Sequence, residues 1–273
     1  MAVNEINVKS IITKSNLPDA DYVINPYGGC NHSCIYCYAR FMKRFSGHDE
    51  KWGGYIDVKV NAADLIPKKS KKYIGKSIFI ASVTDPYIAL EKKYQLTREI
   101  LKKLAGLKPT LNIQTKSDLV LRDIDILKQL EDTMVGLTLT TLDDAIRQEV
   151  EPGAAPVERR INALRVLKAN GIKTYGFIGP ILPYLTDWKE IILKTKDFVD
   201  FYMFENLNTA GSIWVDIKRW LEINHPNLLK HYVEIYKLKN GYWDSVANEI
   251  DTFCKKENVG YKIYFHHGKD KGR

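Results

Sequence analysis

Three cysteines in one short segment are the residues of this chain best suited to metal chemistry. Cys30, Cys34 and Cys37 form a C-x₃-C-x₂-C pattern, whereas Cys254 stands alone near the other end. Secreted disulfide proteins distribute their cysteines along the chain. The clustering therefore indicates a metal ion or an iron–sulfur cluster in a reducing compartment.

The number of thiols distinguishes two kinds of site. A structural zinc ion takes four ligands, usually from two separated pairs, and the nearest fourth candidate, His32, lies between two of the cysteines. A four-iron cluster can bind three thiolates and leave its fourth iron open to another ligand. The sequence favours a [4Fe-4S] cluster, with a structural metal site as the alternative.

Hydrophobic periodicity predicts the elements that position this segment. Apolar runs typical of buried strands lie at residues 21–25, 77–83, 111–115, 134–140, 172–178 and 201–205. Helical patterns lie between them, two of them ending before Gly106 and Gly171. Apolar strands linked by helices pair in parallel. We expect an α/β fold, a partial (β/α)₆ TIM-type barrel with its active site at the carboxyl ends of the strands.

The pattern changes after residue 211. Apolar stripes at helical spacing follow one another and end in a predicted strand at residues 261–265. We therefore expect residues 1–211 to form the barrel and residues 212–273 to form a helical extension packed on it, closed by that last strand.

Composition sets wider bounds. Hydrophobic residues make up 45% and charged residues 27% of the 273 residues, as in globular proteins. The net charge of +8 permits a polyanionic partner without implying one. No run approaches the roughly 18 apolar residues of a membrane span, and the first residues lack a signal pattern. We expect a soluble, cytoplasmic protein that does not engage a membrane.

The cysteine segment resembles the signature of the radical S-adenosylmethionine (SAM) superfamily. It follows a predicted strand, turns on Gly28 and Gly29, and places Tyr38 directly after the last cysteine. The resemblance implies that the three cysteines hold a [4Fe-4S] cluster whose open iron binds SAM. It implies reductive cleavage of SAM to a 5′-deoxyadenosyl radical, hydrogen abstraction from an unidentified substrate, and an external one-electron reductant of flavodoxin or ferredoxin type.

About two thirds of the chain resembles the spore photoproduct lyase-like branch of that superfamily. The matching pieces are residues 12–14, 25–27, 84–87, 97–101, 115–117, 122–123, 151–152 and 179–180. By this resemblance Thr84 and Asp85 accept hydrogen bonds from the methionyl ammonium, and Lys116 pairs with the methionyl carboxylate. Thr140 is a weaker candidate for the ribose.

Two tyrosines of the cysteine segment also match the branch. The resemblance implicates Tyr36 and Tyr38 in hydrogen transfer and places Tyr38 beside the adenine. Ser82, which we group with the cofactor-binding residues, stands near the position of the lyases' hydrogen-donating cysteine. Since residues 77–87 contain no cysteine, literal photoproduct repair is disfavoured.

Several residues keep an ordinary structural interpretation. Residues 84–87 are also typical of a turn, and the tyrosines of aromatic packing. Cys254 lies on an apolar helical stripe, so we expect a buried structural thiol. Arg159 and Arg160 either reach the barrel mouth or face water. The basic runs 68–72 and 269–273 and the pair His266–His267 are expected at the surface.

Three functions remain open at this point. The favoured one is a radical SAM enzyme with an unidentified substrate, for which nucleic acid is possible. The second is a DNA photoproduct lyase-type repair enzyme. The third, of another class, is a non-enzymatic metal-binding module that contacts nucleic acid through its basic surface.

Overall fold

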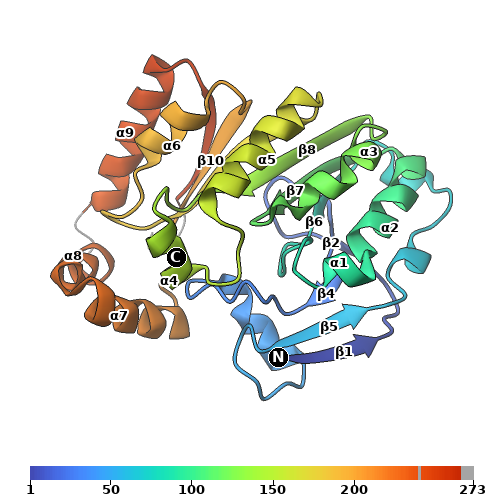
Figure 1. Cartoon of the computed structure of the whole chain (residues 1–273), viewed down its shortest axis with the longest axis horizontal. Coiled ribbons are helices and arrows are strands. Elements are labelled where there is room, and N and C mark those ends of the chain that lie inside the picture. The colour runs from blue at the N-terminus through green and yellow to red at the C-terminus, as the bar shows by residue number, and fades with distance from the viewer. Residues whose placement is uncertain (239–240, 266–273) are drawn as a thin grey trace, which may run out of the picture.

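The computed structural model describes residues 1–238 and 241–265. In this part of the chain the main sheet has eight strands in the order β11-β10-β9-β8-β7-β6-β3-β2 (Figure 1). Neighbours from β3 to β11 are parallel, and β2 is antiparallel to β3. The strands are β2 (Ile12–Lys14), β3 (Tyr22–Ile24), β6 (Ser77–Ile80), β7 (Thr110–Thr115), β8 (Asp132–Thr138), β9 (Lys173–Ile181), β10 (Phe201–Asn206) and β11 (Gly260–Tyr264).

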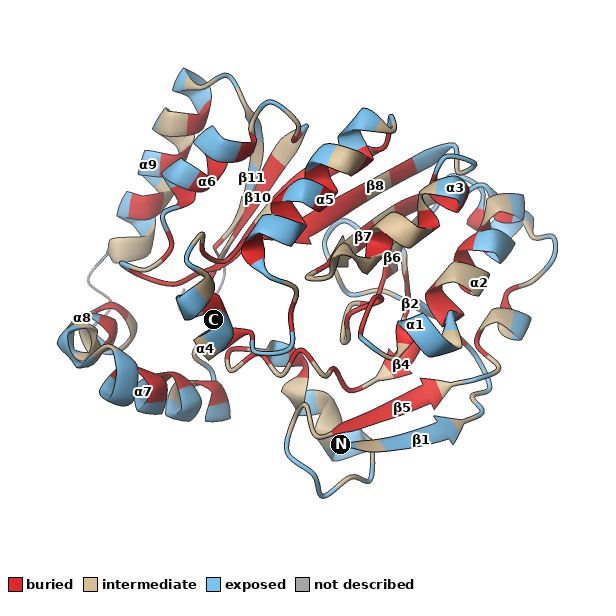
Figure 2. Ribbon diagram, in the orientation of Figure 1, coloured by how far each residue is buried: buried red, intermediate tan, exposed pale blue. Residues whose placement is uncertain are grey.

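Helices connect these strands and cover them on the outside. The α-helices are α1 (Glu91–Tyr94), α2 (Leu96–Leu104), α3 (Ile124–Leu127), α4 (Asp144–Val150), α5 (Val157–Ala169), α6 (Trp188–Thr195), α7 (Ser212–Asn224), α8 (Pro226–Lys237) and α9 (Tyr242–Lys256). The 3₁₀ segments are η1 (Tyr38–Phe45), η2 (Ala63–Leu65), η3 (Lys71–Tyr73), η4 (Ala105–Leu107) and η5 (Asp118–Asp123). Figure 2 shows buried residues on the inward faces of the helices and along the central strands.

The predicted strands agree with the observed sheet. The six apolar runs correspond to β3, β6, β7, β8, β9 and β10, and the last predicted strand corresponds to β11. Apolar side chains such as Ile100 on α2 and Leu164 on α5 are fully buried in the main core. Each such burial contributes about 1.5–3 kcal/mol. The mixed α/β class with a largely parallel sheet is confirmed.

The outer strand β11 contacts the turn between β2 and β3 through side chains. Lys262 and Tyr264 lie on β11, and Asp19 lies in the turn before β3. The Lys262 Nζ is 3.3 Å from the Asp19 carboxylate, and the Tyr264 hydroxyl donates to the same carboxylate. In the described residues no ladder pairs β2 with β11. The seam therefore consists of polar side-chain contacts.

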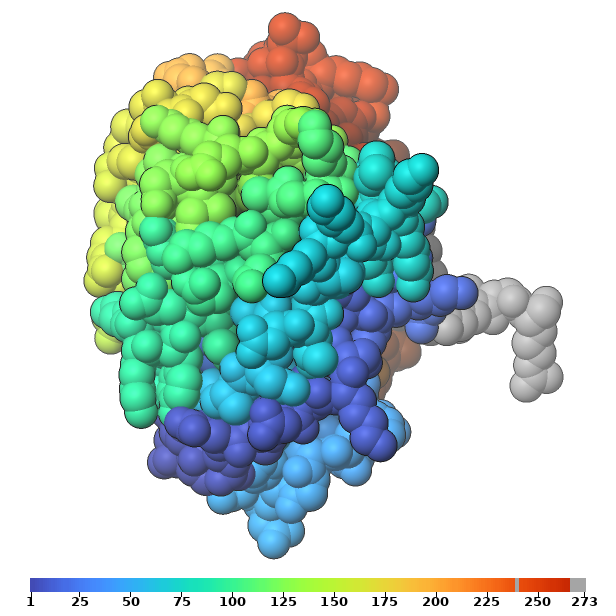
Figure 3. Space-filling view, turned by 90° about the vertical axis from the view of Figure 1, so that its right-hand side faces the viewer, coloured from blue at the N-terminus to red at the C-terminus, as the bar shows by residue number. Residues whose placement is uncertain are grey.

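A smaller sheet was not predicted. It has the order β1-β5-β4, with β1 (Ala2–Ile6), β4 (Tyr27–Gly28) and β5 (Tyr55–Lys59). Asp57 interrupts the apolar run of β5, and β1 is largely exposed, so neither gives a buried-strand signal. Figure 3 shows these N-terminal segments, in blue, gathered at one end of the molecule. Strand β4 leads directly into the cysteine segment.

The C-terminal segments pack in two places. Val246, Ile250 and Cys254 of α9 belong to the main core, beside β11. Helices α7 and α8 instead form a second apolar cluster that includes Cys34 and Tyr36. The division into units 1–211 and 212–273 stays a prediction.

Candidate active site

Glycine at position 29 lets the chain turn from β4 into the cysteine loop, residues 30–37. Gly29 has φ +76°, and a Cβ there would lie 2.4 Å from the backbone oxygen of Tyr55. A side chain would therefore be strained by both its backbone conformation and the close contact. The glycine turn that sequence analysis singled out is a steric requirement of this approach to β5.

The cysteine loop is held against the end of α4 and the segment that follows it. The Ile35 amide donates to the Val150 carbonyl at 3.1 Å, and the Gly153 amide donates to the His32 carbonyl at 3.0 Å. A Cβ on Gly153 would lie 2.1 Å from the Asn31 oxygen. The backbone of the loop is thus fixed by contacts more than 100 residues away in sequence.

All three clustered thiols are shielded from solvent. Cys30 and Cys34 are buried, and Cys37 is partly buried. Burial is the main cause that raises the pKa of each thiol, that of Cys34 to about 12. Thiolates at these positions need a compensating positive charge, which iron supplies to cysteine ligands. The donor set therefore fits an iron–sulfur cluster.

Below the cysteine loop lies a buried polar group, here called the floor: Tyr36, Thr140, Glu151 and Arg160. The Tyr36 hydroxyl donates to the Glu151 carboxylate, and the Thr140 hydroxyl donates to it at 2.8 Å. Arg160 Nη2 lies 2.6 Å from the same carboxylate. Burial alone would raise the pKa of Glu151, but the cationic neighbours, Arg160 first, lower it to about 2. The carboxylate is held ionised under the Tyr36 ring.

Asp85 is surrounded by donors. It accepts hydrogen bonds from the Thr115 hydroxyl at 2.7 Å and from the amides of Lys116 and Tyr87 at 2.8 and 2.9 Å. His32 Nδ1 lies 3.4 Å from its second oxygen. Asp85 therefore ties the cysteine loop to the carboxyl end of β7.

Lys116 presents a cation to the same space. Its Nζ lies 5.8 Å from the centre of the Tyr36 ring, and no ion pair of this ammonium occurs among residues 1–238 and 241–265. Burial would lower the pKa of Lys116, but the negative charges available at Cys34, Glu151 and Asp85 raise it. The ammonium stays charged and suits an anionic ligand group.

The remaining predicted residues contact the segments that flank the loop. The Tyr38 hydroxyl donates to the Ser82 carbonyl, and the Thr84 hydroxyl donates to the Gly29 carbonyl at 2.5 Å. The Ser82 hydroxyl accepts from the Asn25 amide at 3.3 Å. The structure thus places Tyr38, Ser82 and Thr84 in contact with one another or with residues that flank the cysteine loop, while the roles of all predicted site residues toward a cofactor stay predictions.

The comparison with protein families decides the class. The model of the radical SAM superfamily matches residues 24–195, which include the cysteine loop and most of the main sheet. The chain belongs to the radical SAM superfamily. This family is catalytic, and membership implies iron–sulfur chemistry and SAM binding.

Relatives and a solved structure match more of the chain. An uncharacterized protein of Methanocaldococcus jannaschii is 42% identical over 253 residues, 93% of each chain. A radical SAM Nalpha-GlyT isomerase of Pseudomonas phage M6 is 25% identical over 71% of this chain and 38% of its own. A solved structure of spore photoproduct lyase complexed with dinucleoside spore photoproduct has a TM-score of 0.71 at 15% identity, covering 96% and 82% of the two chains. At that identity the likeness shows a shared fold.

One part of this radical SAM site was left undecided by the sequence. Arg159 is exposed and pairs with Asp118 at 2.6 Å, whereas Arg160 is buried in the floor. Helical spacing carried the signal, since position 160 follows Val157 by three and precedes Leu164 by four, and both of these are buried. Arg160 therefore lies on the buried stripe of α5.

Other predicted features lie away from the radical SAM site. Cys254 is fully buried in the main core, as its helical stripe predicts, and burial raises the pKa of its thiol to about 11. The pair His266–His267 and the run 269–273 lie outside the described residues. No helix in the described part of the chain is long and apolar enough to cross a bilayer.

Proposed function

We propose that this chain is a radical SAM enzyme that binds a [4Fe-4S] cluster through Cys30, Cys34 and Cys37 and binds SAM beside it. When bound and reduced, the cluster and SAM supply a 5′-deoxyadenosyl radical able to abstract hydrogen from a substrate. The observation that carries the proposal is the clamped three-thiol loop next to the carboxyl end of β7. We propose that the parallel strands β3 to β10 form the partial barrel around this site and that the reductant is an external one-electron carrier.

We also propose roles in SAM binding for residues around the loop. We place the methionyl carboxylate at the Lys116 ammonium, which has no ion-pair partner among the described residues. Thr84 and Asp85 stay our candidates for the ammonium. Since Asp85 already accepts three hydrogen bonds and lies 3.4 Å from His32 Nδ1, its contribution is mainly its charge and the alignment of His32 with β7.

The two tyrosines differ in what they can do. Tyr36 is buried, and Glu151 and Thr140 fix its phenol. Tyr38 is 44% exposed. We propose that both take part in hydrogen transfer, with Tyr38 also lining the adenine. A ribose contact by Thr140 would require its hydroxyl to exchange a present partner, Glu151 or the Gly179 carbonyl.

A repair lyase acting on DNA photoproducts is the second candidate. The fold likeness to spore photoproduct lyase favours it. Against it stands the lack of a cysteine in residues 77–87, where Ser82 lies, and the burial of Cys254 in the main core. A non-enzymatic metal-binding module is not retained, because the family to which the chain belongs is catalytic.

Anaerobic reconstitution tests the proposal. Protein treated with iron and sulfide should bind about four of each and, with dithionite and SAM, release 5′-deoxyadenosine. Cys37→Ala should reduce that release to the background without enzyme, whereas Cys254→Ala should keep it, because Cys254 lies in the core away from the loop. Release from Cys37→Ala at the wild-type rate would refute the proposed cluster.

A further inference from the structure

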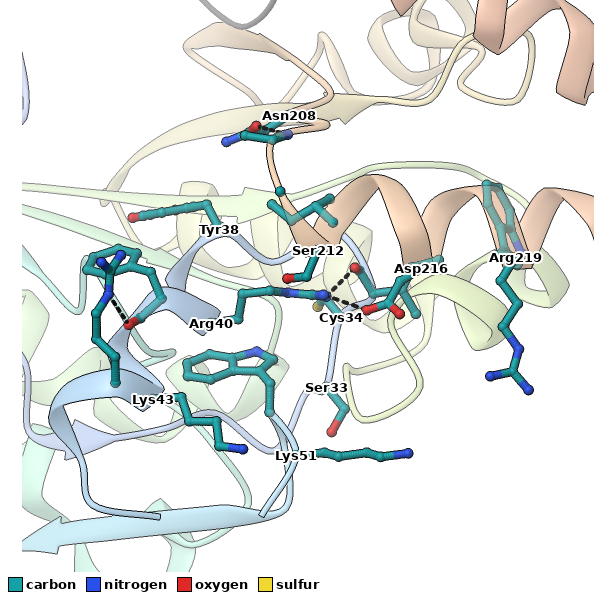
Figure 4. Close-up of a pocket in the computed structure, with 18 of the residues that line it drawn as sticks. Ser33, Cys34, Tyr38, Arg40, Lys43, Lys51, Asn208, Ser212, Asp216 and Arg219 are labelled. Carbon is teal, nitrogen blue, oxygen red and sulfur yellow. Dashed lines mark hydrogen bonds and ion pairs between the residues drawn. The ribbon is translucent and has the colours of Figure 1, made fainter. Parts of the chain in front are cut away.

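A large groove opens beside the cysteine loop, between η1 and α7. Its volume is about 1130 Å³, above the roughly 300–1,000 Å³ of a pocket for a drug-sized ligand. Figure 4 shows residues from η1, from the turn before β5 and from α7 around one open space. Cys34 and Tyr38 also line it, so the groove is continuous with the candidate active site.

Positive charge dominates the lining of the groove. Five cationic side chains line it, against the single carboxylate of Asp216: Arg40, Lys43, Arg44, Lys51 and Arg219. Arg40 pairs with Asp216 at 2.5 Å. Arg44, Lys51 and Arg219 make no ion pair with any residue of the described ranges and are exposed. The groove therefore offers unneutralised cations from both walls.

Aromatic rings alternate with these cations along η1. Tyr38 is 44% exposed and Phe41 is 39% exposed. The two rings are stacked, with their centres 6.5 Å apart. The Arg44 guanidinium lies 5.6 Å from the centre of the Phe41 ring and 5.4 Å from that of Phe45. Exposed rings beside cations form the stacking platforms on which unpaired bases are bound.

We propose that the groove binds single-stranded nucleic acid, with phosphates along the cations and bases stacked on Phe41. A duplex hides the faces of its bases, so it could use the cations but not the rings. An acidic electron-transfer protein would likewise use the charge and leave Phe41 without a function. This inference rests on the proposed function in one respect: we take the bound strand to be the substrate of the radical SAM enzyme.

Fluorescence anisotropy on reconstituted protein tests this binding directly. The probe is a labelled DNA strand of about 16 nucleotides, the upper end of common site sizes, offered single or annealed to its complement. We expect the single strand to bind more tightly than the duplex. Phe41→Ala should weaken its binding at least about 5-fold through lost stacking.

Charge variants supply the matched comparison. The triple variant Arg44→Gln, Lys51→Gln, Arg219→Gln should make binding of the single strand less sensitive to salt. Each lost phosphate contact reduces the slope of log binding constant against log salt concentration by about 0.7, so three lost contacts should reduce it by about 2. The triple variant Lys68→Gln, Lys69→Gln, Lys71→Gln removes the same charge from the exposed basic run and should leave binding unchanged. Equal effects of the two triple variants would overturn the proposal.

Other outcomes also decide the question. Tighter binding of the duplex than of the single strand, or unchanged binding of the single strand by Phe41→Ala, would overturn the proposal. So would a groove variant that binds the strand normally but is reduced more slowly by a flavodoxin-type protein. Binding does not depend on SAM cleavage, so 5′-deoxyadenosine release without strand binding refutes only this inference. Strand binding without that release refutes only the proposed function.

Discussion

The two sides of the cysteine loop are built in opposite ways. On the inner side, the floor buries Glu151 and Arg160 almost completely and gives each polar group a partner. On the outer side, the η1–α7 groove keeps Arg44 and Arg219 exposed and without ion pairs among the described residues. Both sides adjoin the cysteine loop, yet Arg160 in the floor is paired with Glu151, whereas Arg44, Lys51 and Arg219 in the groove have no ion pair among the described residues.

This difference separates stability from ligand binding. A buried ion pair becomes costly when one partner is removed, because the other charge stays in a medium of low polarity. An exposed, unpaired cation costs little to replace, because water solvates it in every state. Substitutions on the inner side should therefore destabilise the fold, and substitutions on the outer side should change binding alone.

The largest expected effect is from the loss of Arg160. Arg160→Met leaves Glu151 buried without its cation and should lower the free energy of unfolding by about 3–5 kcal/mol. The neighbouring Arg159→Met removes an exposed pair with Asp118 and should cost at most about 1 kcal/mol. Urea denaturation of both variants measures the contrast. Similar losses from the two would show that the floor is not specially stabilised.

The pH dependence of stability comes next. The pKa of Glu151 in the folded chain, about 2, lies below its ordinary value of 4.5, so the ionised carboxylate stabilises the fold above pH 4.5. That contribution is lost as the pH falls from 4.5 toward 2. Glu151→Gln should be less stable than wild type at neutral pH, and the gap should narrow over this acid range in urea titrations. A gap that is constant with pH would contradict the assignment.

A smaller effect is expected from disturbing the contact between Gly153 and the cysteine loop. Gly153→Ala places a Cβ 2.1 Å from the Asn31 oxygen, so the loop must shift and should take up less iron on reconstitution, with a stability loss of about 1–3 kcal/mol. Gly106→Ala is the control, because the nearest atom to its Cβ is 3.9 Å away. Iron content per chain is the measurement, and full loading of Gly153→Ala would show that the loop tolerates movement.

The smallest effect is expected in the groove. Arg44→Gln and Phe41→Ala should each change the free energy of unfolding by less than about 0.5 kcal/mol, because both side chains are exposed. Thermal and urea denaturation measure this. A larger loss would mean that the groove residues support the fold, and the contrast between the two sides would fail.

The sequence predicted those features that depend on residues close together in the chain. The cysteine spacing marked the loop, and apolar runs marked β3 and β6 to β11. The role of Arg160 was within reach, because its spacing from Val157 and Leu164 places it on a buried stripe. The prediction did not weigh that periodicity for a charged residue, since arginine is rarely buried.

Other features depend on contacts between distant segments. The groove exists because η1 and α7, about 170 residues apart, face each other. The short strand β5 gains its burial from β1 and β4 rather than from an apolar run of its own. Neither the groove nor the burial of β5 can therefore be recognised from any single window of sequence.

The polar seam between Asp19 and Tyr264 has a consequence for biosynthesis. These two residues are 245 positions apart, so the ribosome must synthesise the chain through β11 before the contact forms. Until β11 arrives, β10 presents an unpaired edge on that side, and open edges of this kind promote aggregation. Folding of the main sheet is therefore expected to finish only once β11 has been synthesised, and β11 then protects the nascent protein from association with other copies.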